Sequence, residues 1–203
     1  MPPQADPISS EEALRGALQV FWERGYAGTS IDTLITEAGL NRAAIYRRFG
    51  SKQGFFAALL EYYRRTVSLR MLKPLTAADA GLAALHEFFH RLRLYGESDA
   101  GHRGCLMAMT ASEVSVREQQ ITQVVREFMT EVRGLFRAAL GRAADAGMVR
   151  PEVALDDLSD YLLGSLLGFM TLARSPVPRT MLAHHIDGVL RTLDALTTSS
   201  SPR

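Results

Sequence analysis

Basic and aromatic side chains gather on one short segment of the chain, at Arg42, Tyr46 and Arg47. An arginine can bind a phosphate as a charge, or guanine O6 and N7 as a fork of two donors. The phenol of Tyr46 can donate to a phosphate oxygen. Ala43 and Ala44 are small enough for the backbone to approach DNA, and their methyl groups suit contact with thymine methyls. The segment therefore predicts contact with the major groove of double-stranded DNA.

The flanking residues predict the helices that would hold these side chains. Apolar residues recur at helical spacing over 31–38, and Thr29 stands where a capping residue is expected. Gly39 suits the left-handed residue that ends a helix, and Asn41 suits the N-cap of the next. The second helix is expected over 42–49. Two helices joined by a short turn that contains glycine form a helix-turn-helix.

A third helix is expected to begin directly after this pair. Ser51 would cap it and Lys52 would be its first residue, so its free N–H groups and positive dipole end could face a phosphate. Charge distribution agrees with this interpretation. The whole chain carries a net charge of only +1, but residues 40–73 contain eight basic side chains against one acidic residue, Glu61. Such a local basic patch is typical of a DNA-binding face.

Residues 14–60 resemble the tetracycline-repressor-like (TetR) family of bacterial transcription regulators. The motifs that carry the resemblance are Gly25-Tyr26, Thr29, Ala38-Gly39-Leu40, the short helix with Tyr46 and Phe49, and Ser51-Lys52. The family often has Gly-Thr or Ser-Thr where this chain has Ala43-Ala44, so a hydroxyl that usually helps to contact DNA is missing. Arg48 can point away from the groove. The DNA contacts predicted together by residues and resemblance are Thr29, Arg42, Ala43, Ala44, Tyr46, Arg47 and Lys52.

The remaining sequence predicts an all-α protein, because no strand-like alternation survives along its 203 residues. We expect about nine helices. They divide into an N-terminal three-helix DNA-binding domain at 9–52 and a C-terminal helical domain at 53–197 for ligand binding and dimerisation. The tails at 1–8 and 198–203 are expected to be disordered. The helices are expected over 10–24, 31–38, 42–49, 51–71, 77–95, a short stretch ending near 112, 115–146, 155–173 and 180–196.

The last two helices carry apolar residues on more than one face, so each must be covered on two sides. Gly164 and Gly168, four residues apart, leave a flat strip for close approach of another helix. The resemblance implies that these helices pair with their mates in a four-helix dimer interface, although a buried hairpin in a monomer is the alternative. The predicted interface residues are Leu162, Gly164, Gly168, Ile186, Val189 and Leu193.

The resemblance also implies a small-molecule effector inside the C-terminal helices. Few charged residues fall on their inner faces, which favours an apolar or aromatic ligand. The same residues would equally serve as plain core, and a regulator that binds DNA constitutively is a further alternative. The candidate pocket residues are Phe88, Leu92, Met107, Met109, Phe128, Met129 and Phe169.

His86, Glu87 and His90 spell H-E-x-x-H, in which two histidines one helical turn apart can bind Zn²⁺ while the glutamate acts as a base. A zinc hydrolase is therefore an alternative hypothesis. The motif lies on an amphipathic packing helix, however, and no sheet typical of such enzymes is predicted. We expect no catalytic residue, no metal and no cofactor.

The only cysteine, Cys105, excludes a disulfide within the chain and suits a reducing cytoplasm. We expect it to be a buried small apolar residue, with thiol sensing near His102 and Arg103 as the alternative. The N-terminus lacks the features of a signal peptide, and no apolar run is long enough to cross a membrane. The sequence thus predicts a cytoplasmic, homodimeric, ligand-responsive repressor whose other partner is palindromic operator DNA.

Overall fold

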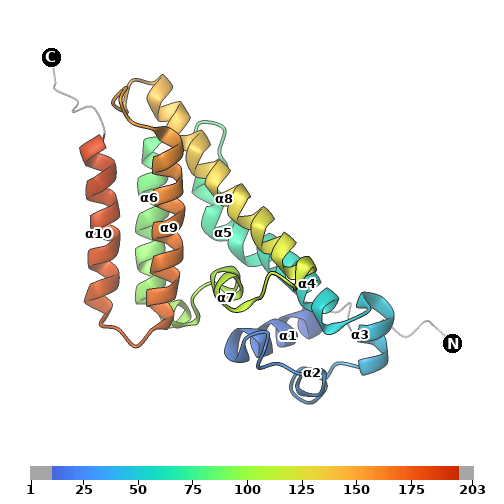
Figure 1. The fold of residues 1–203 in the computed structure, drawn as a ribbon. Helices are drawn as coiled ribbons and strands as arrows, with labels where there is room; N and C mark the ends of the chain where they lie inside the picture. The colour runs from blue at the N-terminus through green and yellow to red at the C-terminus, as the bar shows by residue number, and fades with distance from the viewer. Residues whose placement is uncertain (1–10, 197–203) are drawn as a thin grey trace. The chain divides into compact units, whose positions relative to one another are not determined.

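The computed structural model describes residues 11–196, and every regular element longer than one residue in this range is a helix. The all-α prediction is confirmed, while the tails predicted at 1–8 and 198–203 lie outside the described residues. The elements, drawn in Figure 1, are α1 (Glu11–Arg24), α2 (Ile31–Ala38), α3 (Arg42–Phe49), α4 (Lys52–Tyr63), η1 (Arg64–Ser68), α5 (Leu69–Leu72), η2 (Lys73–Thr76), α6 (Leu82–Glu97), η3 (Asp99–Arg103), α7 (Leu106–Glu113), α8 (Gln119–Asp145), α9 (Leu155–Arg174) and α10 (Arg179–Leu196).

The described chain divides into two compact units whose boundaries differ from the predicted division at residue 52. The first unit joins the chain up to Thr66 to Leu106–Glu127, and the second joins Val67–Cys105 to the chain from Phe128 onward. Helix α8 therefore contributes to both units. The sequence did not predict this discontinuity, because a contact between distant segments leaves no periodic signal in either one.

Aromatic side chains form the core of the first unit. The ring of Phe21 on α1 lies 4.4 Å from Phe56 and 6.4 Å from Phe55, both on α4, measured between centroids. Phe49, at the end of α3, lies 5.0 Å from Phe55. Burying each large side chain contributes about 1.5–3 kcal/mol. Because Phe55 and Phe56 are fully enclosed, α4 is part of this unit rather than a linker after it.

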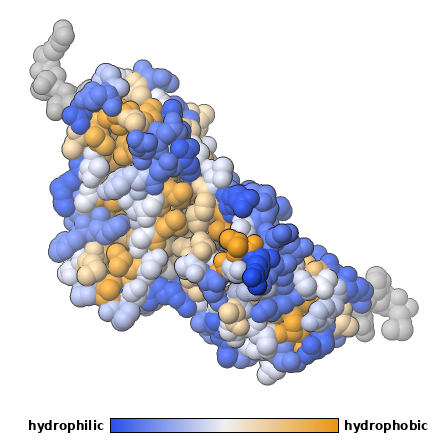
Figure 2. All heavy atoms as spheres, viewed as in Figure 1, coloured by the Kyte–Doolittle hydropathy of each residue, from blue (hydrophilic) through white to orange (hydrophobic). Residues whose placement is uncertain are grey.

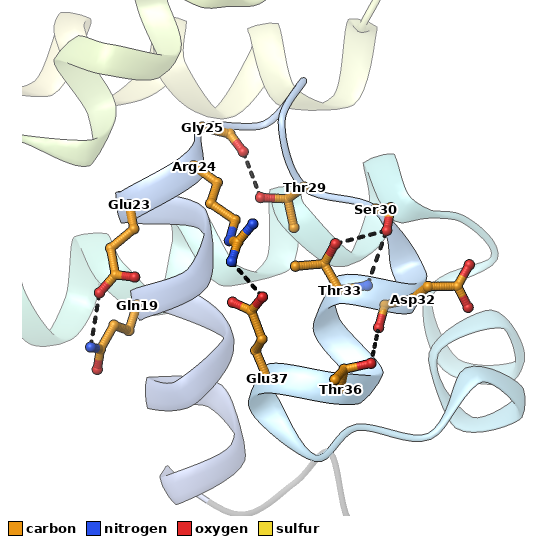
Figure 3. A network of polar contacts seen from close by, with 10 residues as sticks. All are labelled: Gln19, Glu23, Arg24, Gly25, Thr29, Ser30, Asp32, Thr33, Thr36 and Glu37. Atoms are coloured by element: carbon orange, nitrogen blue, oxygen red, sulfur yellow. Dashed lines mark hydrogen bonds and ion pairs between the residues drawn. The ribbon is translucent and has the colours of Figure 1, made fainter.

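Local capping residues set the ends of α2 and α3. The Ser30 hydroxyl accepts from the Thr33 amide at 3.0 Å, so the cap of α2 is Ser30 and not Thr29, as Figure 3 shows. Gly39 ends α2 in the left-handed conformation with φ of 64°, as predicted. The Asn41 side chain accepts from the Ala44 amide at 3.1 Å, which confirms it as the cap of α3.

The helix expected over 51–71 is interrupted. Its first part, α4, passes into the π-helical segment η1 before α5 resumes the α-helical hydrogen bonding. Within η1 the Thr66 hydroxyl donates to the Tyr62 carbonyl at 2.7 Å, a bond that competes with the backbone ladder. The helix ends in the 3-10 turn η2, where Pro74 stands near the start.

The second unit is built around α6, α9 and α10, which lie side by side (Figure 1). The Phe136 ring on α8 meets Phe88 and Phe89 on α6, with centroids 5.4 Å and 6.0 Å apart. Arg133 on α8 binds the Asp160 carboxylate of α9 at 2.5 Å. Among the described residues no helix is both long enough and apolar enough to cross a membrane.

Replacing Gly39 with alanine should lower the free energy of unfolding by about 1 kcal/mol, because a Cβ is disfavoured at this positive φ. Gly39→Asn should cost less, since asparagine tolerates the left-handed region. Gly134, inside α8 with nothing near an added Cβ, is the control, and Gly134→Ala should stabilise by about 0.5–1 kcal/mol. Urea unfolding of the full chain measures all three, and equal effects at Gly39 and Gly134 would contradict the assignment.

Candidate nucleic-acid interface

One face of α3 is exposed and carries most of the predicted DNA contacts. Arg42, Ala43 and Arg47 are exposed, and 45% of Tyr46 is accessible although it is a large aromatic residue. Arg48 is also exposed, with its guanidinium 5.4 Å from the centre of the Phe49 ring. The opposite face anchors the helix, since Ile45 is fully buried.

The side chains of two predicted DNA contacts, Thr29 and Ala44, are buried rather than exposed. Ala44 is only 4% exposed and lies on the core side of α3 next to Ile45. Thr29 is fully buried, and its hydroxyl donates to the Gly25 carbonyl at 2.7 Å (Figure 3). Thr29 therefore stabilises the turn between α1 and α2 instead of presenting a hydroxyl to DNA.

Ion pairs connect the helices that flank this face. Arg24 on α1 binds the Glu37 carboxylate on α2 at 2.5 Å (Figure 3). Arg42 at the start of α3 pairs with Asp32 on α2. Both partners of the second pair are substantially exposed, and such surface pairs contribute only about 0–1 kcal/mol. A phosphate can therefore replace Asp32 as the partner of Arg42 at little cost.

The ammonium group of Lys52 points to the turn between α1 and α2. Its Nζ donates to the carbonyl oxygens of Tyr26 at 2.9 Å and Thr29 at 3.0 Å, and lies 4.1 Å from the centre of the Tyr26 ring. Burial lowers the pKa of Lys52 and outweighs the opposite influence of nearby carboxylates. A contact with phosphate stays a prediction for this residue. Ser51 caps α4 as predicted, accepting from the Gly54 amide at 3.0 Å.

Two family models match this chain. Residues 13–59 match the model of bacterial regulatory proteins of the tetR family, which includes the whole helix-turn-helix. Residues 81–189, more than half of the chain, match the model of the tetracyclin repressor-like C-terminal domain. The chain belongs to the TetR family of bacterial regulatory proteins. TetR proteins are regulators and not enzymes, in agreement with the prediction.

Relatives resemble this TetR protein over nearly its whole length. The repressor AcnR of Corynebacterium efficiens is 26% identical over 194 residues, covering 95% of this chain and 93% of AcnR. An uncharacterised HTH-type regulator of Bacillus subtilis, YezE, is 24% identical over 182 residues, covering 89% and 94%. The TetR family regulator CifR, solved with cysteine substitutions and bound to 26-bp operator DNA, has a TM-score of 0.80 and 26% identity. The match covers 94% of this chain and 98% of that one.

The residues predicted to line a ligand pocket fall into both units of this TetR protein. Phe88, Leu92 and Phe169 are fully buried in the second unit, where Phe128 is also buried and Met129 is partly exposed. Met107 and Met109 on α7 belong instead to the first unit.

The residues predicted to form a dimer interface separate into buried and exposed sets. Leu162, Ile186, Val189 and Leu193 are buried within the single chain, where they form part of its core. Their place in a dimer interface stays a prediction. Gly164 is exposed with no atom near an added Cβ, and beside Gly168 such an atom would lie 3.8 Å from the His185 ring. Only the two glycines of the predicted set remain on an accessible surface.

Two of the three H-E-x-x-H residues form ordinary ion pairs, and the third, His90, is exposed. His86 Nε2 lies 3.3 Å from an Asp194 carboxylate oxygen, and Glu87 pairs with Arg91 at 2.5 Å on the same helix. Across residues 11–196 no three His, Cys, Asp or Glu side chains are grouped as metal ligands. Cys105 is buried, as expected for a small apolar residue.

Sequence reasoning missed two acidic residues of this interface region, Glu113 and Glu118. Glu113 bonds the backbone that follows Gly25, and Glu118 bonds Gln53 at the start of α4. The signal that was available is the Gly25-Tyr26 pair, whose backbone must find partners outside α1.

Replacing Lys52 with methionine should remove the ammonium donor from the Tyr26 and Thr29 carbonyls, of which Tyr26 keeps only a long bond of 3.4 Å from the Thr29 amide. We expect the free energy of unfolding to fall by about 1–3 kcal/mol, the cost of unpaired polar groups. Thermal unfolding of the full chain measures the change. Lys73→Met, at an exposed lysine, is the matched control and should have little effect. Equal stability of the two variants would show that the bonds of Lys52 contribute nothing.

Proposed function

We propose that this TetR protein is a sequence-specific DNA-binding transcriptional regulator, acting as a homodimeric repressor in the bacterial cytoplasm. The observation that carries the proposal is the exposed face of α3, where Arg42, Ala43, Tyr46 and Arg47 stand opposite the buried anchor Ile45. The operator DNA bound by CifR and the repressor name of AcnR support it.

In this proposal α3 enters the major groove of the DNA and α2 crosses the DNA phosphate backbone. Arg47 and Tyr46 face the groove, and Arg42 exchanges its pair with Asp32 for a phosphate. Two copies related by a twofold axis would require a roughly palindromic operator. Their half-sites would be separated by about 34–36 Å or a multiple of it.

Helices α9 and α10 are the proposed dimer surface. Their exposed side includes Gly164, Tyr161 and Met181, the last two unusually accessible for large apolar residues. Figure 2 shows apolar residues among polar ones on the face of the second unit in view. A second copy would cover this side, while the buried side of each helix belongs to the core of its own chain.

A small apolar or aromatic ligand in the second unit is proposed to release the operator. The family model that matches residues 81–189 and the aromatic interior around Phe88, Phe136 and Phe169 support this part. The ligand must bind the released form more tightly than the DNA-bound form, because equal affinity for both would shift nothing. A regulator without a ligand, binding DNA constitutively, is the alternative.

The exposed face of α3 predicts the effect of two substitutions on DNA binding. Arg42→Ala and Tyr46→Ala should each weaken binding by about tenfold or more, the loss expected for a contact worth about 1–3 kcal/mol. The probe is a duplex selected from a random library by the unmodified chain, measured by fluorescence anisotropy at moderate salt. Arg91→Ala, which removes the same charge from α6, is the control. Unchanged affinity of both α3 variants would exclude this helix from the groove.

A small-molecule panel separates the ligand-responsive repressor from the constitutive binder. A ligand that binds only the native state stabilises by about 2.7 kcal/mol at a hundred times its Kd. We expect an apolar or aromatic compound to raise the midpoint of thermal unfolding and to release the selected duplex. Compounds that stabilise the protein without releasing DNA would contradict the proposed response.

A further inference from the structure

The backbone turn between α1 and α2 is held by a carboxylate from the end of α7. One oxygen of Glu113 accepts from the Tyr26 amide at 2.9 Å, and the other accepts from the Ala27 amide at 2.7 Å. The bonded residues are 87 and 86 positions apart in the sequence. Two parallel bonds to a charged acceptor are stronger and more directional than a single neutral bond.

The carbonyl groups of the same turn are bound by a cation. Lys52, the first residue of α4, donates to the Tyr26 and Thr29 carbonyls. The amides of the turn therefore face a negative charge and its carbonyls face a positive one. Side chains from two other elements thus fix the turn from both sides.

A second carboxylate extends the arrangement. Glu118, directly before α8, accepts from the Gln53 side-chain amide and, at 3.4 Å, from the Tyr26 phenol. The Tyr26 ring also stacks on Phe56, with centroids 5.1 Å apart. Burial, and then Glu118, raise the pKa of Tyr26 to about 12. The phenol, which is protonated near neutral pH at its ordinary pKa, therefore remains a donor to a higher pH.

Gly25 provides the space that Glu113 occupies. Its φ is 73°, and a Cβ at this position would lie 2.7 Å from a Glu113 carboxylate oxygen. The glycine is therefore required twice, by the backbone conformation and by the close approach of the carboxylate. This second requirement ties the Gly25-Tyr26 pair to a residue of α7.

We propose that Glu113 and Glu118 are positioning residues for DNA recognition, which they serve by fixing the turn that leads into α2 and α3. The inference rests on the proposed function. The fixed turn sets the start of α2, and the Asp32–Arg42 pair links α2 to the start of α3. Because α8 runs unbroken over Gln119–Asp145 and contributes to both units, a shift of its first turn would change the bonds of Glu118.

The direction of the change in DNA affinity distinguishes a positioning role of Glu113 from a purely electrostatic one. Removing a negative charge from a DNA-binding unit strengthens DNA binding when only long-range attraction matters. Glu113→Gln keeps the size of the side chain, but one of the two turn amides would face an NH2 donor and the other would keep only a neutral carbonyl acceptor. Positioning therefore predicts weaker DNA binding in spite of the more favourable charge.

The test compares Glu113→Gln with Glu127→Gln in the full chain. Glu127 is exposed in the same unit and bonds only locally to Gln123 among the contacts described for it, so the charge change is matched. We expect Glu113→Gln to raise the Kd for the library-selected duplex about tenfold, the loss of a charge-assisted bond, and to speed hydrogen exchange at the Tyr26 and Ala27 amides. Glu127→Gln should bind as tightly as the unmodified chain or more tightly.

DNA binding is measured well below the midpoint of thermal unfolding, so a loss of stability alone does not change it. Glu118→Gln is the second variant, with a smaller loss of affinity expected because its bond to Tyr26 is longer. Unchanged or stronger DNA binding by both variants would overturn the proposal, as would unchanged exchange at the two amides. If the unmodified chain selects no duplex, the proposed function fails, while the exchange measurement still reports on the contact of Glu113 with the turn.

Discussion

Peptide groups at a helix end that lack a helical partner are the constraint on which the rest of the first unit depends. The turn after α1 has amides and carbonyls that neither α1 nor α2 can bond. Glu113 takes two of the amides and Lys52 takes two of the carbonyls. Thr29 closes the turn by bonding back to Gly25. With these groups satisfied, α2 can begin at one defined place, and α3 follows from it.

Features encoded by neighbouring residues were predictable from the sequence. Gly39, Asn41 and Ser51 were identified as helix-end residues, because capping depends on a side chain and an amide only a few positions away. The all-α class and the exposed face of α3 follow from the spacing of apolar residues. Thr29 was misplaced because Ser30, its neighbour, has an equally suitable hydroxyl. The sequence alone does not show which of two adjacent hydroxyls faces the helix.

Features that depend on distant segments were not predictable. Glu113 and Tyr26 are 87 positions apart in the sequence. A glutamate at a helix end does not indicate such a distant partner. The same reason explains the missed unit boundary at Thr66. For Ala44 and Leu162, small or apolar character fitted either a contact surface or a core. In the folded chain both side chains are buried in the core.

The discontinuous first unit has a consequence for synthesis on the ribosome. Helices α1 to α4 emerge first, but the carboxylates that complete the turn follow only after α6 and α7 have been made. At about 5–20 residues per second, the delay is on the order of seconds. During that time the amides of Tyr26 and Ala27 depend on water as their partner. The nascent helix-turn-helix thus lacks the carboxylate bonds of its turn until α7 has been synthesised. A fragment ending after α4 would never form them.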